Sequence, residues 1–193
     1  MTTTSASGGS DGGTTTSMLS NHNIPIIDAD LIARSIVEPG TPALAELVDA
    51  FGSDILHPDG SLRRAELARR AFATPEATSL LNTITHPCIQ TETSRQFAQA
   101  EAAGQPRVVY DMPLLIDNGL HTGMDLVIVV HADEDTRIRR LMHHRGLDEA
   151  DIRRRIATQI DEATRLWAAD IILDNNGTEA HLRNQVAKLI GKI

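Results

Sequence analysis

Four short apolar runs constrain the fold of this chain more than any other feature. They span residues 24–28 (IPIID), 108–111 (VVYD), 126–130 (LVIVV) and 171–173 (IIL). Continuous runs rich in Ile and Val are typical of strands that are covered on both faces, as in parallel sheets. The pattern therefore predicts an α/β fold with a parallel sheet and helices on both of its faces.

The chain between these runs has the spacing of helices. Residues 42–51 place Leu44, Leu47 and Phe51 on one face, with Pro42 at the start and Gly52 just after. The roughly eighty residues between the first two runs read as helix and turn only, and a simple crossover needs far fewer. We therefore expect an inserted helical lobe at about residues 38–104.

A second helical segment, over residues 137–167, is polar and dense in arginine. This composition indicates a mobile cover. Arginines on such a cover can stabilise charge spread over a transferring phosphoryl group, but most of those in this segment are expected to be ordinary helix surface. We expect a helical lid at about residues 136–165. Arg140 and Arg145 are the leading candidates in it, because they flank a predicted turn that ends at Gly146.

Composition excludes several classes of protein. The 193 residues suffice for one domain with a buried core, and the net charge of -8 argues against a general nucleic-acid binder. No apolar run approaches the ~20 residues that a membrane-spanning helix needs, and a secretory signal is not evident. The single cysteine, Cys88, rules out an internal disulfide and suits a reducing compartment. We therefore expect a cytoplasmic monomer or small homo-oligomer that acts on small molecules.

Polar residues gather where the apolar runs end. They are Asp28, Asp30, Asp111, His131 and residues 174–176 (DNN). In open parallel sheets the ligand binds beyond the carboxyl ends of the strands, so this edge is predicted to be the active one. Turns also favour Asp and Asn, which is the structural alternative.

Asp28 and Asp30 lie two residues apart at the end of the first run. If the extended backbone continues, both side chains point the same way. A hydroxyl that attacks phosphorus needs an acceptor for its proton, and a metal ion needs a carboxylate for itself or its waters. One acid for each task is a sensible division. The alternative is that one of them caps the following helix.

Three further residues are candidates with structural alternatives. Arg34 is one helical turn after Asp30 and could bind phosphate or form a surface ion pair with it. His86 precedes Pro87, which fits the first turn of a helix, so His86 could donate to a phosphate or act as a cap. Asp111 could orient magnesium through water, or it could be a turn residue before Pro113.

The first seventeen residues read differently from the rest. They form a Thr/Ser/Gly tract, and a disordered tail is the simplest interpretation of its composition. Gly8 and Gly13 have the spacing of the phosphate-loop pattern GxxxxGK[ST], but Thr14 stands where lysine should, and the first lysine of the chain is Lys188. An apolar strand before the loop is missing too.

From about residue 18 onwards, the order and spacing of the motifs resemble the dephospho-coenzyme A kinase family. The segments that carry the resemblance are IPIIDADLIAR, FGSDIL, DGSLRRAELARRAF, NTITHP, VVYDMPLL, DLVIVV, RRLMHHRGL and ADIILDNNGT. The resemblance implies a P-loop nucleotide-kinase fold over residues 18–193, with a helical substrate lobe and a lid. It also implies Mg²⁺-dependent transfer of phosphate from ATP to the ribose 3′-hydroxyl of dephospho-coenzyme A.

The resemblance also implies roles for individual residues. Asp30 is the implied general base. Asp28 is implied to lie beside the metal ion and to hold it through a water molecule. Arg140 is the implied lid arginine. The implied substrate contacts are Arg34, His86 and Asp111. The implied ATP contacts are Asn175, Asn176, Arg145, Gly9, Gly13 and Thr14.

The N-terminal tract departs from the family pattern. Counted back from Asp28 without a gap, the lysine position falls on Gly12, and the first core strand is expected to be absent or degenerate. Three explanations stay open: a shifted reading frame at the N-terminus, a feeble kinase, or a non-catalytic binder of coenzyme A-like molecules. A kinase for another small molecule, such as shikimate or a nucleoside monophosphate, is a further alternative.

Overall fold

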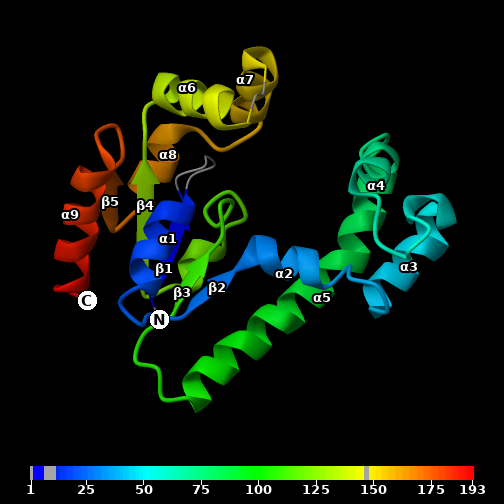
Figure 1. The fold of residues 1–193 in the computed structure, drawn as a ribbon, viewed down its shortest axis with the longest axis horizontal. Helices are drawn as coiled ribbons and strands as arrows, with labels where there is room; N and C mark the ends of the chain where they lie inside the picture. Colours follow the sequence, from blue (N-terminus) through cyan, green and yellow to red (C-terminus); the bar gives the residue numbers. More distant parts are fainter. Residues whose placement is uncertain (1, 7–11, 146–147) are drawn as a thin grey trace. The chain divides into compact units, whose positions relative to one another are not determined.

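The computed structural model describes residues 2–6, 12–145 and 148–193, without the side chains of residues 2–6, 12–14, 144, 145 and 155. The chain divides into two compact units (Figure 1). Residues 1–27 and 100–193 form one, which we call the sheet unit, and residues 28–99 form the other, the helical unit. Each unit has its own hydrophobic core.

A five-stranded sheet with the order β2-β3-β1-β4-β5 is the frame of the sheet unit. Its strands are β1 (Thr2–Ala6), β2 (Ile26–Asp28), β3 (Val109–Asp111), β4 (Leu126–His131) and β5 (Ile171–Asp174). β1 pairs in parallel with β3 and β4, and β4 pairs in parallel with β5. The four strands predicted from the apolar runs are confirmed, with small shifts at their ends.

The first core strand was expected to be absent or degenerate. The structure shows that it is present, with a degenerate sequence. β1 has the sequence TTTSA and lies between β3 and β4 in the sheet. Its register runs from Thr2 opposite Leu126 to Ala6 opposite Val130. Threonine is β-branched and favours strands, and a strand with a neighbour on each side can pair its backbone groups on both edges. Composition alone does not report this pairing.

Helices cover both faces of the sheet. Those of the sheet unit are α1 (Gly12–Ser20), α6 (Glu134–Arg145), α7 (Glu149–Ala157), α8 (Glu162–Trp167) and α9 (Glu179–Ile190), with a 3-10 turn, η2 (Leu120–Gly123). Ile128 and Val130 of β4 belong to one core cluster with Leu19 of α1 and Leu182 of α9. The alternate residues Val127 and Val129 pack with Ile116 and with Leu166 of α8. The run 126–130 is therefore apolar throughout because its two faces are both buried.

The helical unit contains α2 (Ala29–Ser35), α3 (Pro42–Phe51), α4 (Arg64–Ala71), most of α5 (Pro75–Ala102) and a 3-10 turn, η1 (Ser53–Ile55). Leu44, Leu47, Ile55 and Leu67 form the centre of its small core. The predicted helix over residues 42–51 is confirmed. It begins after the cap residue Thr41, whose Oγ1 accepts a hydrogen bond from Leu44 N.

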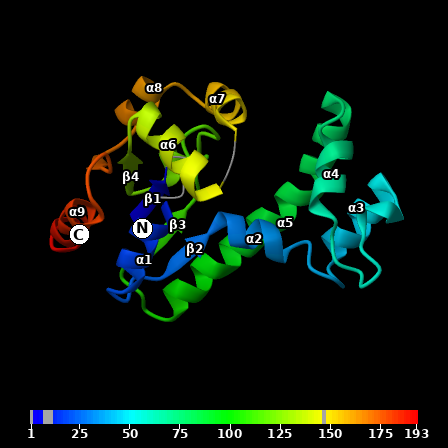
Figure 2. The ribbon, with the colours of Figure 1, turned by 45° about the horizontal axis from the view of Figure 1, so that its top comes forward.

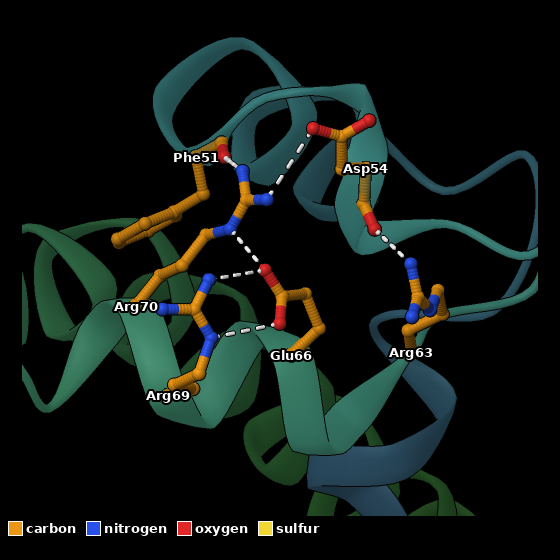
Figure 3. A network of polar contacts seen from close by, with 6 residues as sticks. All are labelled: Phe51, Asp54, Arg63, Glu66, Arg69 and Arg70. Carbon is orange, nitrogen blue, oxygen red and sulfur yellow. Dashed lines mark hydrogen bonds and ion pairs between the residues drawn. The ribbon is translucent and has the colours of Figure 1, made fainter.

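A charged network joins α3, η1 and α4 within the helical unit (Figure 3). Arg70 donates from Nη1 to the carbonyl of Phe51 and from Nε to Glu66 Oε1, both at 2.6 Å. Arg69 adds two more hydrogen bonds to Glu66. These bonds, first from Arg69 and then from Arg70, lower the pKa of Glu66 to about 2.

Figure 2 shows α6, α7 and α8 gathered near the carboxyl end of β4. Within the described part of the chain, no helix combines the length and apolar character that a membrane crossing requires.

Candidate active site

Asp111 is joined directly to the first helix of the chain. It ends β3, and its Oδ2 accepts a hydrogen bond of 3.2 Å from Thr16 Oγ1 on α1. The neighbouring Thr15 is fully buried, and its hydroxyl has no hydrogen-bond partner in the described part of the chain. A carboxylate and hydroxyls therefore gather beside β1, and such oxygens are the donors that Mg²⁺ takes.

The structure contains no protein cage for a metal within its described residues, where no group of three or more His, Cys, Asp or Glu side chains is so placed. In phosphoryl-transfer sites, Mg²⁺ is held by one or two protein oxygens together with substrate phosphates and water. The Asp111 and Thr16 pair fits this donor set.

The strand and helix that flank residues 7–11 lie where the phosphate-loop pattern would place them, although residues 7–11 themselves lie outside the described part of the chain. A central parallel strand ends at Ala6, and α1 begins at Gly12, the position to which the gapless count assigns the family's lysine. Gly13 and Thr14 lie in the first turn of α1, and Gly9 lies outside the described residues. A helix that starts here directs backbone N–H groups towards bound phosphate.

Asp28 and Asp30 do not lie on one face of an extended strand, so that expectation was wrong. β2 ends at Asp28, and α2 begins at the next residue. Asp28 is the N-cap of α2, and its Oδ1 accepts a hydrogen bond of 2.9 Å from Leu31 N. This cap satisfies a backbone N–H at the start of α2 that would otherwise be unpaired, which favours a helix directly after Asp28. The strand therefore does not continue as far as Asp30.

Asp30 differs from Asp28 in its surroundings. It is exposed in the first turn of α2, and Arg34 is exposed one turn later on the same helix. The predicted shared face of Asp30 and Arg34 is confirmed by this helical register.

His86 does not begin a helix, which corrects the expectation from His86-Pro87. α5 starts at Pro75 and runs through Pro87, and Thr74 Oγ1 accepts a hydrogen bond from Ala77 N at its start. Proline removes one hydrogen bond within a helix and strains the preceding turn, but a long helix can absorb that loss. His86 lies on an exposed polar face of α5 and lines a shallow groove of about 610 Å³ with Asn82.

The predicted lid segment folds into α6, α7 and α8. Arg140 is half-buried on α6, and its Nη2 donates to the carbonyl of Gly177, in the loop after β5, at 3.4 Å. Arg145 is the last residue of α6, and its side chain is outside the described part. The two residues therefore lie on one continuous helix and do not flank a turn; a turn at Gly146 falls outside the described residues.

Asn175 and Asn176 shape the loop that follows β5. Asn175 is buried at 5% exposure, and its N–H donates to the His131 carbonyl at 2.7 Å. Asn176 accepts from Asp133 N and donates to Asp174 Oδ1. Both residues fix this loop against the end of β4, whatever else they contact.

Two buried arginines escaped sequence reasoning. Arg137 on α6 is 7% exposed and Arg165 on α8 is 4% exposed. Burial lowers the pKa of Arg165, the carboxylate of Asp117 opposes that shift, and the charge of Arg137 adds to it. The only sequence signal for these two buried arginines was that each stands next to apolar residues in an arginine-rich segment. That signal is too weak to distinguish them from solvent-exposed arginines in the same segment.

The fold and this site define a class: a kinase-like P-loop domain with a parallel sheet, a central strand β1 that precedes helix α1 in the chain, and an acid at the end of the neighbouring strand. The dephospho-CoA kinase family model matches residues 2–181. The chain belongs to the dephospho-CoA kinase family.

Named relatives agree with this assignment. A dephospho-CoA kinase of Corynebacterium efficiens is 60% identical over 176 residues, covering 91% of this chain and 88% of the relative. One from Corynebacterium glutamicum is 56% identical with the same coverage. A crystal structure of a Thermus thermophilus protein has a TM-score of 0.84 at 25% identity, covering 99% of this chain and 96% of its own. Dephospho-CoA kinase from Campylobacter jejuni shares the fold, with a TM-score of 0.75 at 23% identity over 98% and 94% of the two chains.

The family match starts at residue 2, so it includes β1 and α1 in spite of their composition. The relatives at high identity are kinases by name, and none of the comparisons supports a non-catalytic binder.

Proposed function

We propose that this chain transfers the γ-phosphate of ATP to the ribose 3′-hydroxyl of dephospho-coenzyme A, the last step of coenzyme A biosynthesis, in the cytoplasm. The observation that carries the proposal is the 60% identity to a dephospho-CoA kinase over 91% of the chain. The contact between Asp111 and Thr16 beside a central parallel strand supports it, because phosphoryl transfer needs oxygen donors there.

On the acceptor side, Asp30 is the proposed general base. Its carboxylate is exposed at the start of α2, whereas Asp28 uses Oδ1 to cap that helix. A bond forms between the ribose 3′-oxygen and the γ-phosphorus as the bond from that phosphorus to the β,γ-bridging oxygen breaks. ADP leaves, and Asp30 takes the hydroxyl proton. Arg34 and His86 are the proposed contacts to dephospho-coenzyme A.

On the donor side, the start of α1 with Gly13 and Thr14, together with Gly9, is the proposed cradle for the phosphates of ATP. Asp111 and Thr16 are the residues that would hold Mg²⁺, with Asp28 acting through water. When bound, Mg²⁺ neutralises charge on the phosphates. The remaining proposed ATP contacts are Arg140, Arg145, Asn175 and Asn176.

The missing lysine weakens this site but leaves its other parts in place. A lysine there supplies a fixed positive charge near the γ-phosphate, where such groups provide much of the catalysis. The N–H groups of α1 and the oxygens of Asp111 and Thr16 do not depend on it. We therefore propose a functional kinase with a reduced rate.

The acceptor can be tested by product analysis. Purified protein is incubated with Mg²⁺-ATP and, in separate reactions, dephospho-coenzyme A, shikimate and AMP, and each product is analysed by phosphorus NMR. We expect a new 3′-phosphate only with dephospho-coenzyme A. Phosphorylation of shikimate or AMP instead would assign the chain to another small-molecule kinase activity.

A further inference from the structure

Asp117 forms a hydrogen bond with the connection between α7 and α8. Its Oδ1 accepts a hydrogen bond of 2.9 Å from the backbone N–H of Ile160. Arg165 of α8 donates from Nη2 to the carbonyl of the same residue at 3.2 Å and to Gln159 Oε1 at 3.5 Å. Both backbone groups of Ile160 are therefore held by charged side chains, and charge-assisted hydrogen bonds of this kind are stronger than neutral ones.

Asp117 and Arg165 also act on one another. Arg165 is almost fully buried, and the carboxylate of Asp117 is the strongest of the nearby charges that favour its cationic form. Asp117 Oδ2 is buried too, with no hydrogen bond from the described part of the chain. Arg165 is thus a desolvated cation near a half-buried carboxylate, and removing Asp117 takes away the charge that most favours the cationic form of Arg165.

The segment that carries Asp117 is a rigid extension of β3. Residues 112–119, which we call the Asp111 loop, are closed by backbone hydrogen bonds from Leu115 N to Met112 O, from Asn118 N to Leu114 O and from Gly119 N to Ile116 O. Leu115 is fully buried and Ile116 nearly so. Asp117 is therefore joined to Asp111 by a short segment whose buried residues Leu115 and Ile116 pack into the core, and packed interiors transmit strain.

The α7–α8 connection and the start of α8 are also packed against the core of the sheet unit. Ile160 and Leu166 lie against Ile116 and against Val127 and Val129 of β4. The α7–α8 connection (residues 158–161) is therefore fixed to the sheet and to the Asp111 loop. The arginine-bearing helices α6 and α7 of the predicted lid precede it in the chain.

We propose that Asp117 and Arg165 are positioning residues: they clamp the α7–α8 connection to the Asp111 loop and so align the lid arginines with the metal-binding end of β3. The role of the lid in this inference rests on the proposed function. The clamp does not, because it consists of contacts in the structure. Its loss should weaken ATP binding and leave the binding of dephospho-coenzyme A unchanged.

The test compares Asp117→Ala with Asp148→Ala. Asp148 also accepts a lid backbone N–H, from Ala150 at 3.0 Å, but it lies outside the Asp111 loop. We expect Asp117→Ala to speed hydrogen exchange at the Ile160 amide and to raise the KM for ATP about tenfold, or about 1.4 kcal/mol. Asp148→Ala should do neither. Asp117→Asn keeps an acceptor oxygen for the Ile160 N–H but loses the charge beside Arg165, so it should restore slow exchange at Ile160 and recover only part of the affinity.

Unchanged exchange at Ile160 in Asp117→Ala, or an equal rise of KM in Asp148→Ala, would overturn the clamp. If the wild-type chain shows no turnover, the proposed function fails, but the exchange result and a Kd for ATP from calorimetry still decide the clamp. If Asp117→Ala does not fold, Asp117→Asn and Arg165→Gln, alone and combined, make the same test. Non-additive effects on the Kd for ATP support the clamp, and additive ones contradict it.

Discussion

Asp28 and Asp30 show how two carboxylates two residues apart acquire different roles. Asp28 caps α2, whereas Asp30 is exposed in its first turn. We predict that Asp30→Asn lowers kcat by about 10²–10⁴-fold, the usual contribution of a general base, with little change in stability. Steady-state kinetics and thermal unfolding measure the two effects. Unchanged turnover would remove Asp30 from the mechanism.

Two variants of Asp28, Asp28→Asn and Asp28→Ala, distinguish its role as a helix cap from the effect of its charge. Asp28→Asn keeps an oxygen that can accept from Leu31 N, whereas Asp28→Ala loses the cap and should destabilise the helix by about 0.5–2 kcal/mol. If capping is the only role of Asp28, the asparagine variant retains full activity. A large fall in its kcat would instead indicate a role of the charge near the metal.

Glu66 makes the helical unit sensitive to acid. Its pKa falls from 4.5 to about 2 because Arg69 and then Arg70 hydrogen-bond its carboxylate. A group with a depressed pKa in the folded state stabilises that state above its unfolded pKa and loses this contribution as the pH falls towards the folded value. We predict that the midpoint of thermal unfolding drops between pH 4.5 and pH 2 more steeply in the wild type than in Glu66→Gln. Glu46→Gln, at an exposed site on α3, is the control and should follow the wild type.

At the scale of elements, the start of α1 is where the chain departs most from its family. Counted back from Asp28 without a gap, the missing lysine falls on Gly12, the first residue of α1. We predict that Gly12→Lys raises kcat on the order of 10²-fold, comparable to the effect of one preorganised charged donor. Gly12→Ala is the control, because it improves helix propensity without adding charge. Equal gains in both variants would mean that helix stability, and not charge, limits the rate.

Elements were predictable from the sequence where a single pattern decides them. β4 and α3 follow from their apolar runs and, for α3, from Pro42 at its start and Gly52 just after its end. β1 was not predictable, since pairing with neighbours on both edges stabilises a Thr-rich strand that has no apolar pattern. The start of α5 was misassigned to Pro87, although Thr74 and the proline after it carry the stronger cap signal.

The candidate site was predictable in part for the same reason. Strand ends could be located, so Asp111 was found, but its hydrogen bond to Thr16 depends on how α1 packs beside β3. Likewise, the burial of Arg137 and Arg165 comes from the packing of α6 and α8, and spacing along one helix cannot reveal it.

At the scale of the whole molecule, the proposed reaction draws on both units. The sheet unit carries Asp111, Thr16 and Arg140, and the helical unit carries Asp30, Arg34 and His86. We propose that ATP contacts the first set and dephospho-coenzyme A the second.

The most direct measurement is the transfer of labelled γ-phosphate from ATP to dephospho-coenzyme A by the chain with its own N-terminal sequence. We predict ATP-dependent formation of coenzyme A that is slow in the wild type, faster in Gly12→Lys and abolished in Gly12→Lys combined with Asp30→Asn. Absence of labelled coenzyme A with both the wild type and Gly12→Lys would contradict the assignment of this chain as a working kinase.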